Sequence, residues 1–253
     1  MRRKQDNVNQ QSLQALGKLL LGKIDPSLLG IGSTKIVDFL EHVGSSAPRA
    51  KTESGEPVSR WQDALIEKEI GKGASVLDLG CGNGKLLERL MREKNVFGQG
   101  IELDLAQVFE CVERGVPVFQ GDLDAGLKGF GDASFDYVIL EETLQTLKRP
   151  DLMLGEMLRV GRKGIVSFPN FAYWRVRLDL TVRGRMPITE WLPYKWYDTP
   201  NIHLFALNDF LDWAEAAAVV IDRGFVLSEG EVRELRGDDN LHAEEVLLVL
   251  KKR

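Results

Sequence analysis

The stretch that decides the fold is Ser75-Val-Leu-Asp-Leu-Gly-Cys-Gly-Asn-Gly84, an apolar run that ends in three glycines at alternate positions. Residues 76–79 predict a short buried strand, and the pattern from Lys85 to Leu90 predicts a helix directly after the glycines. Glycine lets the backbone turn tightly and approach a ligand without Cβ clashes. The helix start adds unpaired N–H groups and a positive dipole end. The sequence therefore predicts a small-molecule site at the carboxyl end of a strand, where open α/β sheets bind ligands.

The spacing of these glycines does not match two common nucleotide-binding motifs. The dinucleotide-binding motif is Gly-x-Gly-x-x-Gly, whereas Gly84 follows Gly82 by two positions. The phosphate loop of NTPases needs a Lys-Ser/Thr pair after its last glycine, whereas a leucine follows Lys85. Asp78, before Gly80, fits neither motif. The pattern Asp-x-Gly-x-Gly-x-Gly resembles the first motif of class I S-adenosylmethionine (SAM)-dependent methyltransferases, which implies SAM or S-adenosylhomocysteine as the ligand.

Three further apolar runs each end in an acidic residue. The runs 96–101, 116–120 and 135–140 are followed by Glu102, Asp122 and Glu141. An acid at the tip of the second strand can accept both ribose hydroxyls of a nucleoside, which we expect of Glu102. In the methyltransferase pattern, an Asp in the position of Asp122 contacts the adenine amino group. A single acid is as well explained as a helix N-cap or a solvated loop residue, but three in this order favour a ligand site. The predicted cofactor site comprises Asp78, Gly80, Cys81, Gly82, Gly84, Glu102, Asp122, Leu123 and Glu141.

Length and composition agree with a globular domain that has an appendage. The chain has 253 residues, enough for one domain of about 150–200 residues and an extension. Its 33 basic and 38 acidic residues give a net charge of −5, which argues against a dedicated nucleic-acid binder. No apolar run approaches the length of about 20 residues that a membrane span requires. Cys81 and Cys111 cannot build a disulfide framework. We expect a cytoplasmic protein without nucleic-acid or membrane partners.

The chain divides into a helical N-terminal extension (1–44), a linker (45–60) rich in Ser, Pro, Glu and Lys, and a methyltransferase-like domain (61–253). Alternating strand and helix patterns run to residue 168, which indicates a parallel sheet with helices on both faces. A helix over 208–218 then precedes two strands, 221–227 and 245–250, which should pair as an antiparallel edge. We expect an α/β fold: a doubly wound, mostly parallel sheet of the Rossmann-like class I methyltransferase type, with an antiparallel C-terminal edge and the helical extension.

The segment 169–205, called the insertion below, is rich in aromatic residues and arginine. It holds three of the five tryptophans and should lie beside the carboxyl edge of the sheet. Trp, Tyr and Arg are favoured anchors of protein interfaces. The insertion is therefore interpreted as a lid over an acceptor, as a docking surface for a partner protein, or as a lid that packs only on its own domain. The residues expected on a partner or acceptor surface are Trp174, Arg175, Arg177, Trp196 and Tyr197.

Several segments closely resemble the methionine-biosynthesis protein MetW family, over about residues 65–253. They include Gly164-Ile-Val-Ser-Phe-Pro-Asn-Phe171, Trp174-Arg-Val-Arg177, Gly184-Arg-Met-Pro187, Leu192-Pro-Tyr194 and Trp196-Tyr-Asp-Thr-Pro-Asn-Ile-His203. The resemblance implies a class I methyltransferase-like fold and a role beside homoserine O-acyltransferase, with which family members associate and whose activity they support. Residues 1–60 lie outside the family pattern, as does the pair Glu141-Glu142, where a smaller or amide pair is expected.

The sequence leaves methyl transfer open. The sulfonium of SAM carries the reactive methyl, so only a hydroxyl or amine acceptor would require a base from the protein. Glu141 and Glu142 are the candidates by position and His203 is the second choice, although helix-start acids and a structural turn histidine explain them better. No Cys/His cluster has the spacing of metal ligands. Two functions remain: a SAM-dependent methyltransferase for a small molecule or protein, or a SAM-binding, non-catalytic partner of homoserine O-acyltransferase. The size of the insertion and the weak base candidates favour the second.

Overall fold

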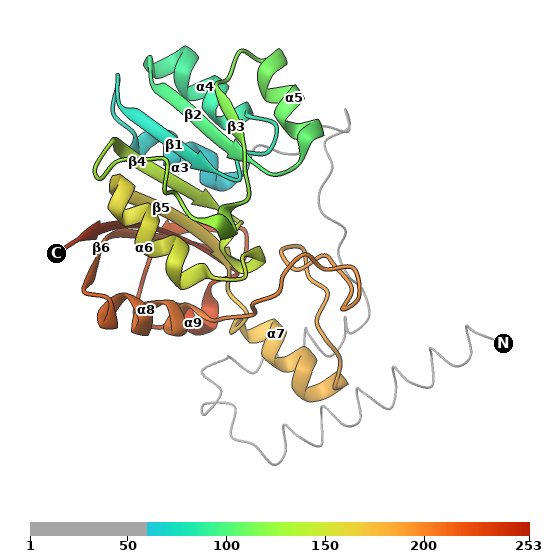
Figure 1. The fold of residues 1–253 in the computed structure, drawn as a ribbon. Helices are drawn as coiled ribbons and strands as arrows, with labels where there is room; N and C mark the ends of the chain where they lie inside the picture. Colours follow the sequence, from blue (N-terminus) through green and yellow to red (C-terminus); the bar gives the residue numbers. More distant parts are fainter. Residues whose placement is uncertain (1–59) are drawn as a thin grey trace.

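The computed structural model describes residues 60–253 (Figure 1). The predicted helical extension (1–44) and all but the last residue of the predicted linker (45–60) lie outside these described residues. The described part is built on one eight-stranded sheet with the order β3-β2-β1-β4-β5-β8-β6-β7. Its strands are β1 (Ser75–Leu79), β2 (Phe97–Glu102), β3 (Val118–Gln120), β4 (Phe135–Glu141), β5 (Gly161–Pro169), β6 (Val219–Ser228), β7 (Glu231–Glu234) and β8 (Glu245–Lys252).

The direction of the strands confirms the predicted mixed sheet. Strands β1 to β5 pair in parallel. Strand β8 lies between β5 and β6 and runs antiparallel to both. This arrangement brings the start of β8 to the same edge of the sheet as the carboxyl ends of β1, β2, β4 and β5. The edge where the sequence predicts ligands therefore also receives residues from a distant part of the chain.

Helices cover both faces of the sheet (Figure 1), as the alternation of elements predicts. The helices are α3 (Trp61–Glu69), α4 (Lys85–Lys94), α5 (Leu105–Glu113), α6 (Pro150–Val160), α7 (Trp174–Leu178), α8 (Leu207–Ala216) and α9 (Asp239–His242). Three single turns of other helix types are η2 (Leu123–Ala125), η3 (Leu144–Thr146) and η4 (Asp179–Arg183). Buried side chains of α3, α4 and α5 form one core with alternate sheet residues, and those of α6 and α8 form the other. The fold is therefore doubly wound.

The central strands read as continuous apolar runs because both of their faces are buried. Val76 and Ile139 point to the core under α3 and α4, whereas Leu77 and Val138 point to the core under α6.

Strand β3 begins later than the apolar run that predicts it. Pro117 has no N–H to donate, and its carbonyl accepts a hydrogen bond from Gly100 just before β3 begins.

The tail follows the prediction with one addition. The predicted helix 208–218 is α8, and the predicted strands 221–227 and 245–250 are β6 and β8. Strand β7, which pairs antiparallel with β6, was not predicted. Its four residues are mostly exposed, so they lack the apolar alternation by which a strand is recognised.

The insertion has a small core of its own. Its buried side chains belong to α7 and the segments on either side: Tyr173, Trp174, Val176, Leu178, Val182 and Leu192. Asn170 connects the insertion to the domain, because its side-chain amide donates to the carbonyl of Ala243 (2.8 Å) and its oxygen accepts from the N–H of Leu207 (3.1 Å). No helix in residues 60–253 is long and apolar enough to cross a membrane.

Candidate functional site

The glycine loop (residues 80–84) joins β1 to α4 and lies over the end of β2. The N–H groups of Gly80 and Cys81 both donate to the carbonyl of Ile101, at 2.8 and 3.1 Å. All three glycines have positive φ values: 78° for Gly80, 54° for Gly82 and 75° for Gly84. Side chains rarely adopt this conformation, which explains the glycine at each turn position. The loop thus forms the predicted strand–turn–helix unit.

Two of these glycines are too close to other groups for a side chain, whereas the third has ordinary contact distances around it. A Cβ at Gly80 would lie 2.7 Å from the Thr143 hydroxyl, and one at Gly84 would lie 2.9 Å from the thiol of Cys111. At Gly82 the nearest atom to such a Cβ is a side-chain oxygen at 3.8 Å. A Cβ at Gly82 would therefore fit without displacing a neighbouring atom.

Glu102, at the end of β2, holds the glycine loop. One carboxylate oxygen accepts from the N–H of Gly82 at 2.8 Å. The other accepts from the N–H groups of Leu103 (2.7 Å) and Asp104 (2.9 Å). An ionised carboxylate has about four lone-pair sites, so these three hydrogen bonds leave one, on the oxygen that accepts from Gly82. The carboxylate lies next to the glycine loop.

Asp78 is buried in β1, two residues before the glycine loop, and is 4% exposed. Burial raises the pKa of Asp78 to about 7, and the positive charge of Arg60 opposes that shift. An acid in this state changes its charge near neutral pH. Asp78 therefore adds a titratable group beneath the loop.

Asp122 and Leu123 follow β3 as predicted, but their side chains have different roles. The exposed carboxylate of Asp122 caps η2, because it accepts from the N–H of Asp124 at 2.9 Å. Leu123 is 8% exposed and belongs to the core under α6. Any contact of Leu123 with a ligand would have to use its backbone.

The side chain of Cys81 packs toward the sheet. A Cβ at Gly100 of β2 would lie 2.4 Å from the Cys81 sulfur, so only glycine fits beside this thiol. The sulfur of Cys111 on α5 lies 3.9 Å from that of Cys81, and both are free thiols. Burial raises the pKa values of both thiols, which disfavours the nucleophilic thiolate. Cys81 can therefore offer a ligand its backbone.

Glu141 and Glu142 lie at the end of β4, beside the glycine loop in the sheet order. Glu141 is nearly buried, with 10% of its side chain exposed, and its carboxylate lies 3.6 Å from the guanidinium of Arg60. Burial raises the pKa of Glu141 to about 8, while Arg60 opposes the shift. Glu142 has a φ of 48°, and its N–H donates to Ser167 of β5. The two neighbouring acids therefore have different environments.

Glu245, the first residue of β8, joins this acidic edge. In the antiparallel pairing it lies opposite Pro169, at the end of β5. Its carboxylate is 1% exposed and accepts from the ring N–H of Trp61 (2.5 Å) and the amide of Gln62 (3.0 Å). The same amide donates to Glu142 at 3.3 Å. Sequence reasoning missed Glu245 and Gln62, because no local motif surrounds them.

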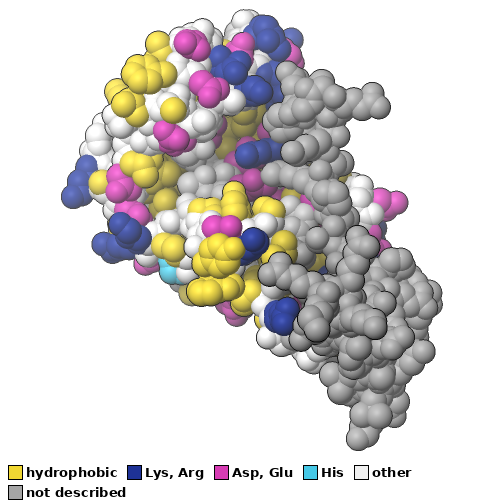
Figure 2. All heavy atoms as spheres, turned by 90° about the vertical axis from the view of Figure 1, so that its right-hand side faces the viewer, with side chains coloured by type: hydrophobic (Ala, Val, Ile, Leu, Met, Phe, Trp, Pro, Cys, Tyr) yellow, Lys and Arg dark blue, Asp and Glu magenta, His cyan; other side chains and the backbone are white. Residues whose placement is uncertain are grey.

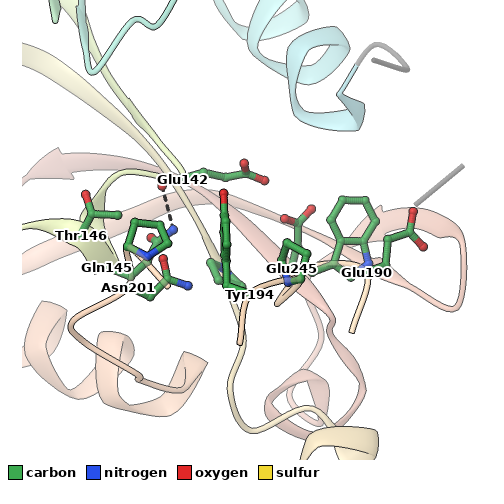
Figure 3. A pocket seen from close by; sticks show the side chains of 11 residues that line it. Glu142, Gln145, Thr146, Glu190, Tyr194, Asn201 and Glu245 are labelled. Carbon is green, nitrogen blue, oxygen red and sulfur yellow. Dashed lines mark hydrogen bonds between the residues drawn. The ribbon is translucent and has the colours of Figure 1, made fainter. Parts of the chain in front are cut away.

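A pocket of about 100 Å³ lies between the end of β4, the start of β8 and the insertion (Figure 3). It is called the acidic pocket below. Figure 3 shows Tyr194 between Gln145 on one side and Glu245 and Glu190 on the other. Its lining residues are Glu142, Gln145, Thr146, Pro169, Glu190, Trp191, Pro193, Tyr194, Pro200, Asn201 and Glu245.

The other predicted residues lie on the insertion. The side chain of His203 is exposed. The backbone N–H of His203 donates to the backbone carbonyl of Gln145 at 3.0 Å. Trp174 is 2% exposed and packs in the core of the insertion, so it does not contribute to a surface. Arg175 lies over its ring at 5.2 Å, and Arg177 is exposed.

Trp196 and Tyr197, in contrast, are on the surface, as a partner or acceptor surface would require. They are 77% and 63% exposed. Their rings meet edge to face, with centroids 5.5 Å apart. The structure thus separates the predicted surface residues into a buried tryptophan and exposed side chains.

Solved structures with the same fold include proteins with different stated activities. A SAM-dependent methyltransferase of Thermotoga maritima, described as a possible histamine N-methyltransferase, has a TM-score of 0.55 and 17% identity, over 76% of this chain and 87% of that one. The [4+2]-cyclase SpnF has a TM-score of 0.57 and 17% identity, over 82% and 85% of the two chains. At these identities the likeness shows a methyltransferase-like fold and leaves the chemistry open.

Comparison of sequences gives a relative of higher identity than these solved structures. A curated relative from Rhodopirellula baltica, the bifunctional methionine biosynthesis protein MetXA/MetW, is 37% identical over 202 residues. The match covers 76% of this chain and 32% of the relative, so the chain spans about a third of that protein. The model of the methionine biosynthesis protein MetW family matches residues 60–250. The chain belongs to the MetW family of methionine biosynthesis proteins.

Proposed function

We propose that this MetW family protein binds SAM or S-adenosylhomocysteine at the glycine loop and supports homoserine O-acyltransferase in the cytoplasm as a non-catalytic partner. The observation on which the proposal chiefly depends is the Glu102 carboxylate, which accepts from Gly82 and retains an acceptor site beside the loop. The ribose hydroxyls of a nucleoside are donors of the kind that such a carboxylate binds. A Cβ at Gly82 would meet no atom closer than 3.8 Å, which is consistent with a ligand beside this glycine.

The proposed docking surface is the exposed apolar part of the insertion. Figure 2 looks onto the side of the molecule where the insertion lies in Figure 1, and hydrophobic side chains gather there among basic ones. Exposed groups of large apolar side chains are typical of interaction sites. The docking surface comprises Met186, Ile188, Tyr194, Trp196, Tyr197, Ile202 and Leu204, each at least 45% exposed.

The bifunctional relative supports the choice of partner. Its name joins MetXA and MetW in one chain, and most of its length lies outside the part that matches this protein. Fusion of two proteins into one chain keeps them at a high effective concentration, which favours their working together. We infer that this chain and homoserine O-acyltransferase associate as separate proteins.

An active SAM-dependent methyltransferase is the second candidate. The observation in its favour is Glu141, whose pKa of about 8 suits a base that works near neutral pH. Glu141 is the last residue of β4 and lies at the same edge of the sheet as the glycine loop. A small-molecule or protein acceptor would have to reach this edge.

A pull-down with the tagged full-length protein, with and without added SAM, tests the partner proposal. We expect homoserine O-acyltransferase among the retained proteins when these are identified by mass spectrometry. Retention of other proteins with no acyltransferase under either condition would contradict the partner role. Transfer of a labelled methyl group from SAM to a cell extract would instead support the methyltransferase.

A further inference from the structure

The acidic pocket is lined mainly by hydrogen-bond acceptors. Three of its lining residues are glutamates, Glu142, Glu190 and Glu245, and none of its described lining residues is lysine or arginine. Several lining donors are already used within the protein. The hydroxyl of Thr146 donates to the Thr143 carbonyl at 2.8 Å, and the ring N–H of Trp191 donates to Glu244 at 2.9 Å. A ligand that enters this pocket meets carboxylates and few unused donors.

Gln145 adds an acceptor that has no partner among the described residues. Its side chain is 6% exposed, and its amide oxygen is buried and accepts no hydrogen bond there. The amide nitrogen donates to the carbonyl of Glu142 at 2.7 Å, which orients the group (Figure 3). The insertion also holds the backbone, because the N–H groups of Ile202 and His203 donate to the Gln145 carbonyl. A buried acceptor without a partner is unfavourable, so a ligand that donates to it would be favoured.

The negative charges of the pocket carboxylates are only partly balanced by hydrogen-bond donors and basic side chains. One amide, that of Gln62, donates to both Glu142 and Glu245. Among the residues that the structure describes, Arg60 is the one basic side chain that pairs with Glu142, at 3.7 Å, and it is shared with Glu141. Burial and the nearby Glu142 raise the pKa of Glu245, as expected for two acids held close together. A bound cation would relieve this repulsion.

The size and walls of the pocket favour a small organic cation. Its volume of about 100 Å³ is smaller than the cavity of about 150 Å³ that holds benzene, so it suits a group of a few heavy atoms. The rings of Trp191 and Tyr194 offer apolar surface and an attractive face for a cation. A metal ion is a poor fit, because in residues 60–253 no three His, Cys, Asp or Glu side chains converge as ligands.

We propose that the acidic pocket binds a primary ammonium group on a short aliphatic chain. The ammonium donates to Glu142, to Glu245 and to the side-chain oxygen of Gln145, while its methylene groups contact Trp191 and Tyr194. The three N–H donors of an ammonium match three acceptors, two from the segment after β4 and one from the start of β8. The acidic pocket shares Tyr194 with the docking surface, but binding of the ammonium does not require that SAM or a partner protein binds.

Calorimetric titration of the full-length protein at pH 7.5 tests the proposal with propylamine as the probe. We expect saturable binding of propylamine, and none of 1-propanol, which has the same size without the charge. Glu142→Gln should weaken propylamine binding at least tenfold, because it removes a charged acceptor of the ammonium. The control Glu113→Gln changes an exposed acid at the end of α5 and should leave binding unchanged.

Two further measurements make the outcome decisive. If thermal unfolding shows that Glu142→Gln does not fold, Glu245→Gln, which removes the other charged acceptor of the ammonium, replaces it with the same expectation. Nα-acetyl-lysine amide separates the two sources of the ammonium: tighter binding than propylamine indicates a protein lysine, and weaker binding indicates a free amine. Equal binding of 1-propanol, unchanged propylamine binding in folded variants, or displacement by equimolar MgCl₂ would overturn the proposal.

Discussion

The carboxylate of Glu102 accepts a hydrogen bond of 2.8 Å from the N–H of Gly82, which joins the end of β2 to the glycine loop. The two residues come from successive units of the fold, so this bond fixes the distance between the loop and the predicted ribose contact. A second oxygen of Glu102 accepts from Leu103 and Asp104. The carboxylate is therefore held in place before any ligand arrives, which lowers the entropic cost of binding.

Glu102→Ala should weaken SAM binding by at least tenfold. The substitution removes charge-assisted hydrogen bonds to ribose, each worth about 1.5–3 kcal/mol, and it also releases the Gly82 N–H. Titration calorimetry with SAM measures the affinity, and Glu113→Ala on α5 is the matched control. Unchanged affinity would show that Glu102 only organises the loop.

Gly82→Ala and Gly115→Ala form a matched pair that separates backbone strain from ligand contact. Both glycines have positive φ, 54° and 73°, and a Cβ at either position meets no close neighbour. Each substitution should cost about 1–2 kcal/mol of unfolding free energy from strain alone. We expect SAM affinity to fall only for Gly82→Ala, as measured by calorimetry. A similar loss in both variants would mean that the ligand site is not beside Gly82.

Glu141→Gln should change how stability depends on pH. The pKa of Glu141 is about 8 in the folded protein, above its ordinary value of 4.5. Between these values the folded state keeps a proton that the unfolded state has lost, so rising pH lowers the stability, by at most about 1.4 kcal/mol per pH unit.

The variant has no such proton to lose. Compared with the wild type, Glu141→Gln should therefore gain stability from pH 5 to pH 8.5, as measured by urea unfolding. A difference between the two proteins that stays constant with pH would show that Glu141 is ionised throughout this range.

Trp196→Ala combined with Tyr197→Ala should reduce co-purification with homoserine O-acyltransferase. The two side chains are 77% and 63% exposed, so their loss removes apolar contact area while changing the free energy of unfolding by less than about 0.5 kcal/mol. Phe109→Ala is the control, because Phe109 is 61% exposed on α5, outside the insertion. The docking surface is wrong if the double variant retains as much acyltransferase as the control does.

Trp174→Ala should act mainly on stability. The side chain is 2% exposed in the core of the insertion, and truncation of a buried tryptophan costs about 3–5 kcal/mol. Thermal unfolding should therefore show a large loss. Loss of partner binding in this variant would reflect damage to the insertion, so Trp174 is unsuitable for testing the docking surface directly. A stability close to the wild type would contradict this packing.

Much of the fold could be predicted from the sequence, because its signals are local. The apolar runs of β1 and β4 are continuous, as expected for strands buried on both faces. The signals for the glycine loop and Glu102 are equally local, because the loop directly follows β1 and Glu102 is the last residue of β2. Strand β7 is the exception, because four mostly exposed residues have no periodic signal.

The acidic pocket could not be predicted from the sequence. Glu142 and Glu245 are far apart in the chain, and they meet because β8 inserts between β5 and β6. In the sequence, Gln145 is an ordinary polar residue after a strand. In the structure, its backbone carbonyl accepts hydrogen bonds from the insertion. Such contacts depend on the register of paired strands and on the order of the strands in the sheet, which local sequence patterns do not specify.

The sequence by itself determined the α/β alternation, the glycine loop and the acid after β2, since backbone conformation and strand burial leave marks in neighbouring residues. Only the tertiary structure decided which side chains of the insertion are surface and which are core. Trp174 and Trp196 are the same residue type in the same segment, yet one is 2% and the other 77% exposed. Burial depends on what packs against a side chain from elsewhere in the chain, and residue type alone does not report it.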